Sequence, residues 1–126
     1  LIRKLENRKA RRKIFEKGNT LLEYENKKID DLVEKNIELV NLVNYRVLAV
    51  NSPNWASKIG NLLCRTRPPF GIVWSKKGNL ISVSLRSDKN KVFDVSKIAR
   101  KFGGGGHKAA AGFTLKSLKD IPWKSL

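Results

Sequence analysis

Short apolar runs separated by turn residues fill the chain from Ile37 to its end. Valine, leucine and isoleucine dominate these runs, which is typical of strands, and asparagine, glycine and serine separate them. In 81–85 apolar and polar residues alternate, as expected for a strand with one buried face. The pattern predicts five strands, at 37–43, 45–50, 70–74, 80–85 and 113–115. It also predicts a hairpin turn at 75–79 and a hairpin between the first two strands.

Other segments carry apolar residues at helical spacing. Two helices are predicted before the strands and two between them, at 1–17, 19–36, 55–64 and 95–102. Asp94 is favoured over Ser96 as the cap of the last helix. The order strand, turn, helix, strand predicts an α/β fold, with a mixed sheet of about five strands and packed helices. The change of pattern at Ile37 divides the chain into a helical linker or arm, 1–36, and a domain, 37–126.

The two segments also differ in net charge. Residues 37–126 hold 16 Lys and Arg but only four acids, a net charge of +12, whereas residues 1–36 have a net charge of +4. So basic a domain attracts polyanions such as nucleic acid or nucleotide phosphates. The charge of the first segment fits either a basic arm on nucleic acid or a solvated connecting helix, and we favour the connecting helix.

A glycine run and the residues after it form the first candidate ligand-binding segment. Gly103 to Gly106 precede His107, Lys108 and three alanines. Glycines allow a backbone to lie close to a ligand, and alanines favour helix, so we expect the run to lead into a short helix whose first N–H groups suit a phosphate. The alternative is a flexible surface loop, but Phe102 and Phe113 flank the segment, and linkers rarely carry such aromatic residues.

The strand before this run offers a second part of a phosphate site. Alternation in 80–87 places Ser84 and Arg86 on one face. A serine hydroxyl beside a guanidinium is a reasonable floor for a phosphate, although a solvent-facing side of the sheet would show the same pattern. Asn51, Ser52 and Asn54 follow a strand and precede a helix, where they fit helix capping at least as well as ligand binding.

Three segments together resemble a known family: SLRS at 84–87, DVSKIARKF at 94–102 and GGGGHKAAAGF at 103–113. They are similar to the C-terminal substrate-binding domain of the DHH phosphoesterase superfamily, which includes nanoRNases or oligoribonucleases, phosphoadenosine phosphate phosphatases and exopolyphosphatase-like proteins. The resemblance implies that the substrate phosphate is held by Gly104, Gly105, Gly106, His107 and Arg86, with Ser84 as a weaker candidate and Lys108 as a fitting neighbour.

The sequence shows no catalytic centre of its own. It contains no Asp-His-His run and a single histidine, and its one cysteine, Cys64, lies in an apolar helix where it fills core. We therefore assign no catalytic or metal-binding residue. The resemblance implies that Mn²⁺ (or Mg²⁺) belongs to a covalently linked N-terminal DHH domain absent from this chain, which is then part of a longer phosphodiesterase or phosphatase.

The expected partner is a short single-stranded nucleic acid or a nucleotide. An alternative is a non-catalytic RNA-binding module like the glycine-rich C-terminal domain of alanyl-tRNA synthetase, and a third is polyphosphate binding. No apolar run is long enough to cross a membrane, and with no signal peptide and one cysteine we expect a cytoplasmic protein. A homodimer remains open.

Overall fold

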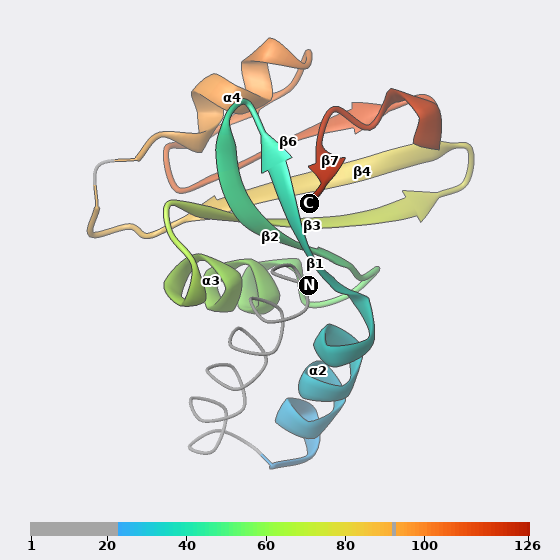
Figure 1. Ribbon diagram of the computed structural model, residues 1–126, viewed down its shortest axis with the longest axis vertical. Helices are drawn as coiled ribbons and strands as arrows, with labels where there is room; N and C mark the ends of the chain where they lie inside the picture. Colours follow the sequence, from blue (N-terminus) through green and yellow to red (C-terminus); the bar gives the residue numbers. More distant parts are fainter. Residues whose placement is uncertain (1–22, 92) are drawn as a thin grey trace.

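A seven-stranded mixed sheet forms the centre of the computed structural model, which describes residues 23–91 and 93–126 (Figure 1). The strand order is β5-β6-β4-β3-β2-β1-β7, and only β2 and β3 run parallel, joined by a crossover through α3. The elements, in chain order, are α2 (Glu23–Asn36), β1 (Ile37–Leu42), β2 (Tyr45–Asn51), α3 (Ala56–Thr66), β3 (Phe70–Lys77), β4 (Leu80–Ser87), α4 (Val95–Lys101), β5 (Gly105–Gly106), β6 (Ala110–Leu115), a 3-10 turn (Leu118–Asp120) and β7 (Lys124–Ser125).

Helix α4 covers one face of the sheet, and α3 and α2 lie on the other (Figure 1). On the α4 side, Val95, Ile98 and Ala99 pack against apolar residues of β1 to β4 and β6. On the α3 side, Ile59 and Leu63 pack with β1, β2 and β3. Because α3 crosses β2, β3 and part of β4, no helix among the described residues lies on the β4–β6–β5 end of that face.

Helix α2 also belongs to the core on the α3 side. Ile29 and Val33 are buried there, and Lys58 of α3 forms an ion pair with Glu25 of α2. The helix ends at Asn36 and β1 begins at the next residue. The predicted helix 1–17 and the first residues of the predicted helix 19–36 lie outside the described residues.

The structure confirms the α/β class, the mixed sheet and all five predicted strands. The predicted number of strands is wrong, because two strands of two residues each, β5 and β7, complete the sheet at its edges. The predicted hairpin between β1 and β2 is present, with Val43 and Asn44 at positive φ in its two-residue turn. In the described part of the chain, no helix is long and apolar enough to span a bilayer.

Candidate glycine-loop phosphate site

The uncovered end of the α3 face contains a pocket of about 500 Å³. Three elements build it: the polar side of β4, the loop and strand that follow α4, and the facing residues of β6. We call it the glycine-loop pocket, and its principal lining residues are Ser82, Ser84, Arg86, Gly103 to Gly106, Ala110, Gly112 and Thr114. It therefore brings together Arg86, Ser84 and the three glycines that the sequence nominated.

The floor of this pocket is low because small residues stand side by side across three strands. Gly112 of β6 pairs with Ser84 of β4 on one side and with Gly105 of β5 on the other. Paired residues of antiparallel strands point to the same face, so the row presents one serine side chain and two bare α-carbons. A Cβ at Gly112 would lie 2.5 Å from the Val83 carbonyl oxygen, so the sheet admits only glycine there without rearrangement.

Arg86 stands at the end of this floor, next to α3. It pairs with Gly71 of β3 and Ala110 of β6. Its aliphatic stem lies over Gly60 of α3, where a Cβ would come within 2.4 Å of Arg86 Cγ. The side chain is half-buried, and among the residues that the structure describes its buried Nε has no hydrogen-bond partner. A buried N–H without a partner is costly, so the position suits an anion that accepts from it.

The glycine run ends a helix rather than starting one. Phe102 is the C-cap of α4, Gly103 follows at φ +84°, and the N–H groups of Gly103 and Gly104 donate to Arg100 O (3.2 Å) and Ala99 O (2.9 Å). These are the two hydrogen bonds of a Schellman motif. The predicted helix after the run is wrong, because Ala110 and Ala111 pair with β4 in β6. The expected helix N-terminus for a phosphate is therefore absent from this place.

The three nominated glycines differ in what they contact. A Cβ at Gly104 would lie 2.0 Å from Gly112 O, whereas a Cβ at Gly105 would meet nothing within 4 Å. Gly106 has φ +142°, and a Cβ there would lie 2.6 Å from Ala111 Cα. Gly104 and Gly106 thus let β5 lie close to β6, and Gly105 faces open space.

Only one backbone N–H of the nominated glycines is directed outward by the hairpin. His107 and Ala110 exchange two backbone hydrogen bonds, of 2.8 and 3.3 Å, so Lys108 and Ala109 form a two-residue turn. The next pair, Gly106 and Ala111, is then a non-hydrogen-bonded pair, whose N–H groups point away from each other. Because β5 is the edge strand, the Gly106 N–H faces outward.

The structure separates His107 and Lys108 from the pocket floor. Both side chains are exposed at the turn between β5 and β6. His107 directly follows Gly106 at the mouth of the pocket, but it is not among the lining residues, and Lys108 lines a different cleft on the α4 side of the sheet. The Lys108 carbonyl oxygen accepts from Val95 N (2.9 Å), which attaches the turn to the start of α4.

Ser87 holds the turn in place, a role that sequence reasoning missed. It is buried, and its Oγ lies 2.8 Å from Phe93 O and 3.1 Å from Lys108 O. Its N–H donates to Ala109 O at 3.0 Å. In the segment SLRS, Ser84 and Arg86 therefore face the pocket, and Ser87 faces inward and positions the β5–β6 hairpin that lines it. The alternation of the strand could have separated these roles.

The described residues do not fit a Mn²⁺ or Mg²⁺ site. Within residues 23–91 and 93–126, no group of three or more His, Cys, Asp and Glu side chains converges. Cys64 is buried, as the sequence predicts, and burial raises the pKa of its thiol. Asp94 caps α4 as predicted, accepting from Ser96 N at 2.9 Å.

Residues 43–122, more than half of the chain, match the DHHA1 domain family. The chain belongs to the DHHA1 domain family. The match includes β2 to β4, α4, the glycine run and β6, so it contains every residue that lines the glycine-loop pocket. DHHA1 domains are associated with DHH phosphoesterases. The resemblance inferred from the three sequence segments is thereby confirmed.

The chain is also similar to individual proteins. The chain is 34% identical over 114 residues to the uncharacterized protein R106 of Acanthamoeba polyphaga mimivirus, covering 85% of this chain and 27% of R106. Among solved structures, it is similar to the pGpG-specific phosphodiesterase PggH of Vibrio cholerae, with a TM-score of 0.53 and 14% identity over 75% of this chain and 34% of that one.

A third similarity is to the C-Ala domain of Aquifex aeolicus alanyl-tRNA synthetase, with a TM-score of 0.41, 21% identity and coverage of 69% and 88%. The likeness to PggH shows the fold. The chain spans about a quarter of R106 and a third of PggH.

Proposed function

We propose that this DHHA1 domain holds the phosphate of a short oligonucleotide or phosphonucleotide for hydrolysis by a DHH-family phosphoesterase. The observation that carries the proposal concerns Arg86. Its side chain is half-buried, and its Nε has no hydrogen-bond partner among the described residues. It lies at the end of a pocket floor formed by Ser84, Gly112 and Gly105. The net charge of +12 on residues 37–126 favours a polyanionic ligand.

Five of the nominated residues have distinct parts in this proposal. Arg86 makes charge-assisted hydrogen bonds to the phosphate, and Ser84 Oγ and the Gly106 N–H add neutral ones. His107, exposed beside Gly106, donates from the mouth of the pocket. Gly104 acts through shape alone, because its N–H already donates to Ala99 O.

Hydrolysis in this proposal takes place in a DHH catalytic domain linked N-terminally to this one. That domain would carry the metal ions, Mn²⁺ or Mg²⁺, for which the described residues of this chain offer no ligand group. The association of DHHA1 domains with DHH phosphoesterases supports the division of labour. Because the fold of this chain is shared with a pGpG-specific phosphodiesterase, pGpG is one ligand to test.

The test is binding of a fluorescently labelled trinucleotide RNA, with and without a terminal phosphate, followed by fluorescence anisotropy at moderate salt. We expect the phosphorylated RNA to bind more tightly, and Arg86→Ala to reduce that advantage by about tenfold or more, as loss of a charged hydrogen bond implies. His107→Ala should reduce it less.

Lys76→Ala is the matched control, because Lys76 is an exposed cation at the far end of β3. Equal losses in Lys76→Ala and Arg86→Ala, or binding that ignores the terminal phosphate, would contradict the proposal. Competition by inorganic polyphosphate as strong as that by RNA would instead point to polyphosphate as the ligand.

A further inference from the structure

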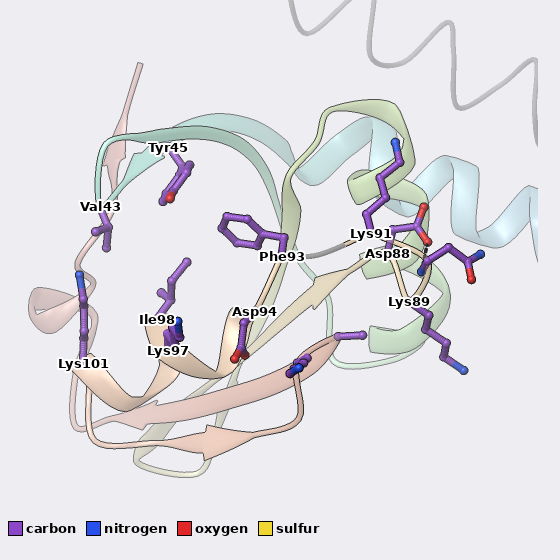
Figure 2. Close-up of a pocket in the computed structure, with 13 residues that line it drawn as sticks. Val43, Tyr45, Asp88, Lys89, Lys91, Phe93, Asp94, Lys97, Ile98 and Lys101 are labelled. Atoms are coloured by element: carbon purple, nitrogen blue, oxygen red, sulfur yellow. Dashed lines mark hydrogen bonds between the residues drawn. The ribbon is translucent and has the colours of Figure 1, made fainter.

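A second hollow, of about 730 Å³, lies on the opposite face of the sheet, between the β1–β2 turn, the loop before α4 and α4 itself (Figure 2). We call it the lysine cleft. Its basic residues are Lys89, Lys91, Lys97, Lys101 and Lys108. Its principal apolar residues are Val43, Tyr45, Phe93 and Ile98.

The cleft is strongly cationic. Its five lysines are all exposed, and none forms a salt bridge with an acid in the described part of the chain. The two acids in the cleft are engaged in local turns: Asp94 accepts from Ser96 at the start of α4, and Asp88 accepts from the Asn90 N–H at 2.9 Å. Clustered lysines without acidic partners favour an anionic ligand.

The rings of Tyr45 and Phe93 form the wall of the cleft opposite α4 (Figure 2). Phe93 stacks on the buried Phe70, with ring centroids 5.5 Å apart and an interplanar angle of 17°. Tyr45 meets both rings edge-on, at 5.2 Å from Phe93 and 5.8 Å from Phe70. Tyr45 is nevertheless 38% exposed. Packing thus fixes the orientation of an aromatic surface that solvent can reach.

Aromatic surface beside spaced cations is the combination that single-stranded nucleic acid requires. Bases stack on aromatic rings regardless of sequence, and lysines follow the phosphates. Lys97 and Lys101 lie one helical turn apart on α4, on the same side of the helix, and Lys108 adds a third cation from the β5–β6 turn. An acidic protein surface would use the lysines but would leave the aromatic wall without a partner.

The two hollows meet at the β5–β6 turn. Lys108 and Ala109 line the lysine cleft, and the next residue, Ala110, lines the glycine-loop pocket. Likewise Arg86 lines the pocket, and Asp88, two residues later, lines the cleft. A ligand that crosses the tip of this hairpin would reach both sites, and exposed His107 lies on the path.

We propose that the lysine cleft binds single-stranded nucleic acid, with a base against Tyr45 and Phe93 and the adjoining phosphates on Lys97, Lys101 and Lys108. This is a second site, and it makes longer strands bind more tightly than those that fill the glycine-loop pocket alone. The passage of one strand through both sites rests on the proposed function above. Binding in the cleft does not.

The test measures anisotropy of a labelled oligoadenylate of roughly 12 nucleotides without a terminal phosphate, a length within the site sizes of single-strand-binding domains. Tyr45→Ala should weaken binding about five- to 100-fold, as loss of base stacking implies. Tyr45→Phe keeps the ring and should bind like the unaltered chain. An abasic strand of equal length should bind more weakly and should not respond to Tyr45→Ala.

A charge-matched pair of variants provides an independent reading that does not depend on the aromatic packing. Lys97→Glu with Lys101→Glu should weaken binding several-fold more than Lys76→Glu with Lys77→Glu, which alters exposed lysines at the far end of β3. If circular dichroism shows that Tyr45→Ala is unfolded, the comparison of the two lysine pairs tests the proposal without it. Equal losses in the two pairs, or equal binding of abasic and normal strands, would overturn the proposal.

The two proposals fail separately. Arg86→Ala should remove the advantage of a terminal phosphate and leave the effect of Tyr45→Ala on the unphosphorylated strand intact. If the unaltered chain binds RNA equally well with and without a terminal phosphate, while Tyr45→Ala still weakens binding of the unphosphorylated strand, only the glycine-loop site is refuted. The reverse result would refute only the lysine cleft.

Discussion

The α-carbon of Gly60 in α3 lies against the side chain of Arg86 in β4, so closely that a Cβ at Gly60 would be 2.4 Å from Arg86 Cγ and 2.8 Å from Arg86 Cβ. Gly71, which pairs with Arg86, contacts the same helix: a Cβ there would lie 2.9 Å from Gly60 O. Two glycines therefore allow α3 to lie close to the sheet beside Arg86. The helix therefore packs against the aliphatic stem of Arg86, whose guanidinium the proposed phosphate site requires.

Gly60→Ala should disturb this arrangement. In a free helix alanine is preferred to glycine by about 1 kcal/mol, but here the added methyl overlaps the Arg86 side chain, whose Cβ is fixed to a central strand. We expect the free energy of unfolding to fall by about 1–3 kcal/mol, as for other overpacked sites. Phosphate-dependent RNA binding should fall with it. Urea denaturation and anisotropy measure the two effects.

The control for Gly60→Ala is the same change in an Arg86→Ala background. Removing Arg86 Cγ takes away the closest contact, so the stability cost of Gly60→Ala should shrink. An unchanged cost would mean that the methyl clashes with the Cβ at position 86, which Arg86→Ala retains, or with another residue, and that Arg86 Cγ is not the decisive contact.

Gly104 and Gly105 form a matched pair for separating shape from binding. Gly104→Ala should destabilise the domain by about 1–3 kcal/mol or more, because its Cβ would lie 2.0 Å from Gly112 O. Gly105→Ala has open space around it and should leave the unfolding midpoint nearly unchanged, while its methyl group obstructs the pocket floor and weakens binding of phosphorylated RNA. Thermal unfolding and anisotropy of both variants test this, and a folded Gly105→Ala that binds normally would argue against the floor as the ligand surface.

Ser87 and Ser84 make a second such pair. Ser87→Ala removes the hydroxyl that contacts Phe93 O and Lys108 O in a buried position, so the domain should lose about 1–3 kcal/mol in urea denaturation. Ser84 is half-buried on the pocket floor, and Ser84→Ala should affect RNA binding rather than stability. Equal stability of the two variants would show that Ser87 does not anchor the hairpin.

The order of apolar and polar residues was enough to predict the longer strands and the cap of α4. The alternation of β4 identified the face that carries Ser84 and Arg86, and Asp94 was correctly identified as the cap of α4. Strands of two residues have too few positions to show a period, so β5 and β7 escaped prediction. β7 exists because the chain returns to pair with β1 at Val40 and Asn41, which only the tertiary structure reveals.

The sequence predicted several residues of the candidate site but not the conformation of the segment after the glycine run. Alanine prefers helix, yet Ala110 and Ala111 are strand residues because β4 offers them a hydrogen-bonded edge, and tertiary pairing outweighs a small intrinsic preference. The lysine cleft escaped prediction for a different reason. Tyr45, Lys97 and Lys108 are distant in sequence and meet only through the fold.

Acid should destabilise the domain partly through Asp94. A hydrogen bond from the Ser96 hydroxyl, with a smaller contribution from the Ser96 N–H, holds the pKa of the Asp94 carboxyl below its ordinary value of 3.8. A carboxylate with a lowered pKa in the folded state stabilises fully above that ordinary value and stops stabilising as the pH falls through the lowered one. Asp94→Asn retains a capping side chain but cannot titrate, so the urea midpoint of this variant should depend less on pH below about 4. Asp120→Asn, at an exposed acid of the 3-10 turn, is the control, and an acid dependence altered equally by both variants would show that the capping carboxylate has no special role.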